Sequence, residues 1–198
     1  MAVLITDMHV VIDFVNQVCH GSFDAQGVPS LEHALDVGSG ALRDFLKIKS
    51  LLEQRPESAR LSDKDFFGVG CLHDIVGNKR NFNGQQISFR SLLEMGFPSL
   101  WIDSLRLVTK LKDEESDPED PESDKIKRYK KFINRITEGE MTPERLIAIM
   151  VKLADLADNM RGDRYNPKES EKIRMARRQN YEWAKEVLGA RLEEFLYA

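Results

Sequence analysis

The sequence predicts an all-α domain of about eight helices, and three observations carry that prediction. Apolar residues recur at spacings of three and four through most of the chain, candidate caps precede several of these stretches, and the alternating pattern typical of strands is scarce. At 198 residues, the chain is long enough for one packed core and too short for two generous domains. We therefore expect a single helical domain over residues 1–198.

The first half of the chain alternates helical stretches with a broken loop. Apolar residues recur at helical spacing up to Cys19 and again from Leu31, and glycines and a proline interrupt the pattern between them. Ser30 and Ser62 can each cap the helix that follows. We expect five helices in this half, over 7–19, 31–46, 62–76, 85–97 and 98–111.

The second half begins with an acidic segment over 113–124, which contains two prolines and little apolar surface. Such a segment has little to bury, so we expect a mobile loop there. Beyond it, Thr142 and Pro143 have the residue types that open a helix, and a long amphipathic pattern ends at Tyr197. The helices expected here are 126–136, 143–160 and 168–197.

Composition and charge exclude several classes of protein. The formal net charge is -4, with 41% apolar and 31% charged residues, which argues against a nucleic-acid surface and for an ordinary soluble protein. No apolar run reaches the roughly 18 residues of a membrane helix, and the N-terminus lacks the pattern of a signal peptide. We therefore expect a cytoplasmic protein without membrane or nucleic-acid partners. Cys19 and Cys71 lie among apolar residues and are expected to be buried free thiols.

Four polar residues in otherwise apolar helical stretches are candidates for a metal site. His73 and Asp74 are adjacent, His33 lies on an earlier predicted helix, and Asp155 lies on a later one. Imidazole and carboxylate groups bind Mn, Fe, Zn and Mg ions, and side chains from several helices can meet at one ion in a bundle core. A His-Asp pair alone is more often a surface or helix-capping feature than a metal site. Asp155 argues further for a site, because burying an unpaired carboxylate is costly unless a cation accompanies it.

The order of these motifs resembles that of the RelA/SpoT-type HD hydrolases, in particular their small single-domain members. The segments that carry the resemblance are "HGSFDAQGVPSLEH", "LHDIV", "VKLADLADNM" and "YEWAKEVL", and together they span most of the chain. Members of this family remove pyrophosphate from the alarmones ppGpp and pppGpp, usually with manganese. The resemblance implies an HD-domain bundle and a nucleotide substrate. It also implies a metal site formed by His33, His73, Asp74 and Asp155.

The same resemblance suggests residues that contact the substrate. Lys112 and Arg177 are the candidates for its anionic groups, and Asn159 matches the family asparagine near the ribose and base. Each has an ordinary alternative: the two cations could be solvated side chains, and Asn159 could end its helix. His20 is expected to order its loop, and His9 lies outside every motif.

The sequence departs from the family pattern next to the metal ligands. The family follows HD with a Glu-Asp pair that orients the attacking water, whereas this chain has Gly77 and Asn78 there. Neither residue can act as a base near neutral pH. The entry loop is one residue shorter, with Asp24 where many members have a basic residue and Ser30 in place of the usual tyrosine.

Three functions stay open on this evidence. The first is manganese-dependent hydrolysis of ppGpp to GDP and pyrophosphate, with weakened activity because the Glu-Asp pair is absent. The second is a phosphohydrolase with another nucleotide substrate, such as NADPH, which the altered entry loop favours. The third is a nucleotide-binding or regulatory protein without turnover, which Gly77 and Asn78 favour.

Overall fold

The computed structural model of the protein describes residues 4–23, 27–56, 58, 60–76, 81–115, 120–162, 164 and 169–198. Within these residues the chain forms eight α-helices and one small antiparallel hairpin, which confirms the all-α prediction. The helices are α1 (Met8–Cys19), α2 (Ser30–Leu52), α3 (Asp63–Leu72), α4 (Phe89–Met95), α5 (Ser99–Val108), α6 (Glu122–Thr137), α7 (Pro143–Asn159) and α8 (Glu171–Tyr197), and the hairpin strands are β1 (Asn81–Phe82) and β2 (Gln85–Gln86).

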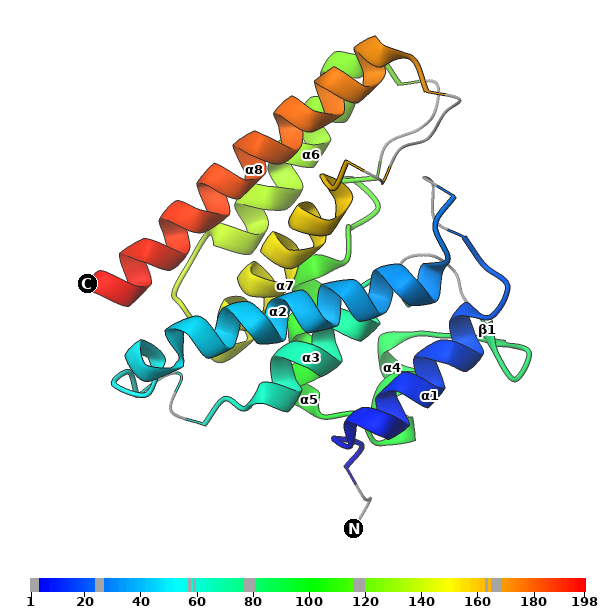
Figure 1. Ribbon diagram of the computed structural model, residues 1–198, viewed down its shortest axis with the longest axis vertical. Helices are drawn as coiled ribbons and strands as arrows, with labels where there is room; N and C mark the ends of the chain where they lie inside the picture. The colour runs from blue at the N-terminus through cyan, green and yellow to red at the C-terminus, as the bar shows by residue number, and fades with distance from the viewer. Residues whose placement is uncertain are drawn as a thin grey trace.

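The helix α7 lies at the centre of the fold, in contact with α2, α3, α5, α6 and α8. Its middle, from Leu146 to Val151, is almost fully buried in the hydrophobic core. On one side of α7, α6 and α8 lie next to each other, and on the other side α2 crosses over α3 (Figure 1). The helix α1 packs against α3, and the hairpin packs against α1 through β1. Because α7 contacts both α2 and α3, these two helices are brought to the same part of the core.

Two glycines allow α2 and α3 to touch backbone to backbone. A Cβ atom added at Gly70 would lie 2.7 Å from the Cα of Gly38, and one added at Gly38 would lie 2.9 Å from the carbonyl oxygen of Phe67. Ordinary side chains would hold the two helices further apart, since interaxial distances of packed helices are about 8–10 Å. This close crossing brings His33, near the start of α2, toward His73, which directly follows α3.

Several predicted boundaries are wrong in ways that local chemistry explains. The helix α3 begins as predicted with a capping box formed by Ser62 and Asp65, but it ends at Leu72 and not at about Val76. The predicted helix over 85–97 begins only at Phe89. The residues before it form the hairpin, whose turn residues Asn83 and Gly84 have φ values of 51° and 78°. An Asn-Gly pair favours this turn, and this signal was missed.

The loop in the acidic segment is shorter than the predicted range of 113–124. Glu114 is buried, and its carboxylate forms an ion pair with Arg135 of α6 at 2.7 Å. Asp113 also pairs with Lys131. The end of the segment belongs to α6, which begins at Glu122. Residues 116–119 lie outside the described residues, so the mobility of the segment stays a prediction.

Two smaller expectations concern the cysteines and the membrane. Cys19 and Cys71 are both free and buried, which confirms the prediction, and burial raises the pKa of the Cys71 thiol to about 12. Among the described residues, no helix combines the length and the apolar character needed to cross a membrane.

Candidate metal centre

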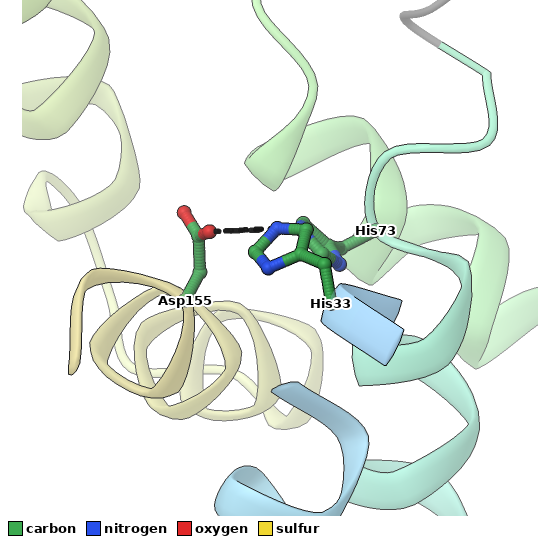
Figure 2. Close-up of side chains that lie close together, drawn as sticks. All are labelled: His33, His73 and Asp155. Carbon is green, nitrogen blue, oxygen red and sulfur yellow. Dashed lines mark ion pairs between the residues drawn. The ribbon is translucent and has the colours of Figure 1, made fainter. Parts of the chain in front are cut away.

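Three helices bring His33, His73 and Asp155 together in one buried cluster (Figure 2). The Nε2 atom of His33 lies 3.4 Å from Oδ1 of Asp155, and Nε2 of His73 lies 3.6 Å from the same oxygen. The two imidazole rings meet edge to face, with 5.0 Å between their centroids. The predicted ligands from α2, the end of α3 and α7 therefore converge, although they are far apart in the sequence.

The spacing of the donor atoms fits one metal ion. All three lie within 4.8 Å of one another. Donors bound at about 2.0–2.2 Å around a tetrahedral ion are separated by about 3.3–3.6 Å. The two measured nitrogen-to-oxygen distances, 3.4 and 3.6 Å, match that separation. They exceed the 2.7–3.2 Å of a normal hydrogen bond, so the two Nε2 atoms are not directly bonded to Asp155.

The environment of His73 supports the same interpretation. Its Nδ1 donates a hydrogen bond of 2.7 Å to the carbonyl oxygen of Gly70. With the proton on Nδ1, the lone pair of the neutral ring lies on Nε2. That atom is buried and has no hydrogen-bond partner among the described residues. A buried polar atom without a partner is costly, and a bound cation at this point would remove the cost.

Asp74 stands at the open edge of the cluster. Its two carboxylate oxygens lie 3.9 Å from Nε2 of His33 and 3.6 Å from Nε2 of His73. Its side chain is 51% exposed, whereas the other three predicted ligands are buried. Asp74 thus lies beside the group of His33, His73 and Asp155 without belonging to it, and it is the most exposed of the four predicted ligands. Its place in a ligand set stays a prediction.

Asp155 is held in place by two neighbours on its own helix. Asn159 donates to Oδ1 at 2.6 Å, and Lys152 donates to Oδ2 at 2.5 Å. Burial alone would raise the pKa of Asp155, but the charge of Lys152 and contacts with the two imidazoles lower it well below its usual value. Asp155 is therefore ionised, as a metal ligand must be. Asn159, predicted as a nucleotide contact, is placed here as a donor to Asp155, and its contact with a nucleotide stays a prediction.

His33 bears a positive charge when no cation is bound. Burial lowers the pKa of its imidazole, but the nearby carboxylates of Asp155 and Asp158 outweigh that effect and raise the pKa to about 9. The imidazolium then provides the positive charge that the surrounding carboxylates require. A metal ion would replace that proton, since only the neutral ring can act as a ligand.

The two predicted substrate cations differ in their placement. Lys112 is exposed on the loop that follows α5. Partial desolvation and the charge of Lys152 lower the pKa of Lys110, two residues earlier, while the charges of Asp155 and Asp74 oppose the change. Arg177 of α8 pairs with Glu169. It lies one turn before Tyr181, whose pKa is raised by burial and by the charge of Asp155.

Other predicted positions lie at the margin of the site or outside the described residues. Gly77, Asn78 and Asp24 lie outside them, so the consequence of the missing Glu-Asp pair stays a prediction. Ser30 is the first residue of α2 and is buried. His20 caps the end of α1 and lines a surface hollow of about 390 Å³ with residues of the hairpin.

Sequence reasoning missed three residues of the site: Lys152, Asp158 and Arg164. Asp158 accepts a hydrogen bond of 2.7 Å from Nδ1 of His33, and Arg164 contacts the same carboxylate oxygen at 2.6 Å. A signal was present, because Asp155 and Asp158 are three residues apart and so share one face of α7. Nothing local identifies the ring that Asp158 contacts.

The sequence was also compared with known proteins. No protein-family model matches the chain, and no curated protein matches it. The assignment of function therefore depends on the motifs of the sequence and on the geometry of the site.

Proposed function

We propose that this protein is a divalent-metal-dependent phosphohydrolase of nucleotides, and that it cleaves ppGpp to GDP and pyrophosphate. The observation that carries the proposal is the convergence of His33, His73 and Asp155, with both Nε2 atoms directed to one buried point. Two imidazoles and a carboxylate form a donor set typical of hydrolytic metal sites. The resemblance to the RelA/SpoT-type hydrolases supports the nucleotide substrate and manganese as the ion.

Some residues of the chain would hold the ion, and others would bind the substrate. His33, His73, Asp155 and Asp74 would hold it, and when bound it would supply Lewis-acid charge at a phosphoryl oxygen and lower the pKa of water. Asp74, half exposed, lies on the side that substrate can reach. Lys110 would supply positive charge for the diphosphate groups, since its ammonium interacts electrostatically with Asp155 and Asp74.

A different nucleotide is the second candidate substrate. Asp24 in the entry loop carries a charge opposite to that of the basic residue that many family members use for guanine. Ser30 is too small to replace the ring of the family tyrosine, and it is buried at the start of α2. These two differences favour a phosphohydrolase acting on another nucleotide, such as NADPH, at the same metal site.

The proposal is tested by incubating the purified protein with Mn²⁺ and a panel containing ppGpp, pppGpp, NADPH and common nucleoside phosphates. Chromatography of the products identifies the substrate and the bond that is cleaved. The variant His73→Gln should lose both Mn²⁺ binding and turnover, because it removes a buried ligand. The control His9→Gln alters an exposed histidine of α1 and should leave both unchanged. Turnover that survives in His73→Gln, or no turnover of any member of the panel by the unmodified protein, would contradict the proposal.

A further inference from the structure

The outer nitrogen of His33 has an anionic partner. Nδ1 lies 2.7 Å from Oδ2 of Asp158, and the side chains are only 7% and 5% exposed. A carboxylate can only accept a hydrogen bond, so Nδ1 of His33 must carry the proton. When the ring is neutral, its lone pair is then confined to Nε2, the atom that faces Asp155 and Asp74.

We propose that Asp158 is a positioning residue for the metal centre, which fixes the orientation and the Nδ1–H tautomer of His33. The inference rests on the metal site of the proposed function and extends it to a residue outside the ligand set. A metal-bound imidazole commonly donates its other N–H to a carboxylate or carbonyl group, which orients the ring and makes it a stronger ligand. His73 meets this requirement with a neutral carbonyl group, that of Gly70, whereas His33 meets it with a full negative charge.

Two carboxylates on one face of α7 lie on opposite sides of the His33 ring. Asp155 lies on the Nε2 side at 3.4 Å, and Asp158, three residues later, lies on the Nδ1 side at 2.7 Å. Residues three apart on a helix are neighbours on its surface, about 5–6 Å apart between Cβ atoms. The imidazole therefore lies between two carboxylates of one rigid helix, and its hydrogen bond to Asp158 keeps Nε2 on the side of Asp155.

Asp158 is itself fixed by two arginines that follow α7. Arg164 contacts Oδ2 at 2.6 Å, and Arg161 contacts Oδ1 at 3.2 Å. Both arginines also lie near Asp36 of α2, at 3.9 and 2.6 Å respectively. Asp36 therefore provides a matched control, because it shares the arginines of Asp158 but is not hydrogen-bonded to His33.

The test compares Asp158→Asn with Asp36→Asn. The Asp158 carboxylate accepts hydrogen bonds from His33 and Arg161 and forms an ion pair with Arg164. An amide is neutral and has a single acceptor oxygen, so in either orientation the contact with His33 is weakened or an arginine faces an NH₂ group. We expect Asp158→Asn to bind Mn²⁺ about 10–100-fold more weakly in a calorimetric titration. Asp36→Asn should bind it as the unmodified protein does. Equal Mn²⁺ affinity in Asp158→Asn and the unmodified protein would overturn the positioning role while leaving the metal site intact.

A spectroscopic measurement on the unmodified protein does not depend on the folding of a variant. With ¹⁵N-labelled histidine and Zn²⁺ as a diamagnetic probe, NMR should show His33 protonated at Nδ1 and bound through Nε2. Binding through Nδ1 would overturn the inference. If the protein binds Mn²⁺ but hydrolyses no nucleotide, the proposed function fails while the role of Asp158 stands. If the unmodified protein binds neither ion, both fail.

Discussion

The close crossing of α2 and α3 can be tested with a single methyl group, by the substitution Gly70→Ala. The new Cβ would lie 2.7 Å from the Cα of Gly38 and 3.2 Å from the carbonyl carbon of Val37. Both neighbours are backbone atoms, which cannot rotate away as a side chain can. The shorter contact must lengthen by about 0.7 Å to reach the 3.4 Å of an ordinary contact, so α2 and α3 must separate.

Two opposing effects set the expected magnitude. Alanine favours a helix interior over glycine by about 0.8–1.0 kcal/mol. Forcing an extra methyl group into a packed core costs about 1–3 kcal/mol, and the rigid obstacle here places the cost near the upper end. We therefore expect Gly70→Ala to lower the free energy of unfolding by about 1–2 kcal/mol. The matched control is Gly189→Ala in α8, where nothing lies within 4 Å of the added Cβ, and it should raise that energy by about 0.5–1 kcal/mol.

The same substitution should weaken metal binding. Gly70 supplies the carbonyl oxygen that holds Nδ1 of His73, and His33 lies on the helix that must move. Functional side chains must hold their positions to within about 0.5 Å, so a shift of the expected size should lower Mn²⁺ affinity. Urea unfolding followed by circular dichroism measures the stability, and calorimetry measures the affinity. If Gly70→Ala is as stable as the unmodified protein and binds Mn²⁺ equally well, the two helices are not held by this contact.

Three further outcomes are expected. Glu114→Gln should cost about 2–3 kcal/mol at pH 7, because it weakens a charged hydrogen bond with Arg135. Burial raises the pKa of Glu114, but Arg135 lowers it by more, so the pKa in the folded state is below the ordinary glutamate value of 4.5. The stability that the ion pair contributes is therefore present above pH 4.5, and it is lost as the pH falls through the pKa of the folded state. Urea unfolding at pH 7 and pH 3 should therefore show the difference from the unmodified protein shrinking at the lower pH, and a constant difference would refute the assignment. Mn²⁺ at 100 times its dissociation constant should stabilise the fold by about 2.7 kcal/mol, a gain that a chelator reverses in thermal unfolding. If the protein hydrolyses ppGpp, Gly77→Glu combined with Asn78→Asp should accelerate turnover, because a general base contributes about 10²- to 10⁴-fold, and slower turnover in this variant would point to a rebuilt site.

The sequence by itself determined the helical class and identified three residues that meet in one buried cluster. Helical periodicity depends on neighbours three and four residues apart, so it is visible in the chain alone and located all eight described helices. The candidate ligands were proposed from a histidine next to an aspartate, an earlier histidine and a carboxylate in an apolar stretch, together with the resemblance to the RelA/SpoT-type hydrolases. His33, His73 and Asp155 do meet in the core, with Asp74 beside them.

Only the tertiary structure decided which partners hold those ligands. Asp158 reaches His33 across 125 residues of chain, and Glu114 meets Arg135 across 21, so no local pattern could have assigned either contact. Residue types are properties of the chain, but the distance between two side chains depends on how closely the helices that carry them can pack. Here the glycines of α2 and α3 set that distance.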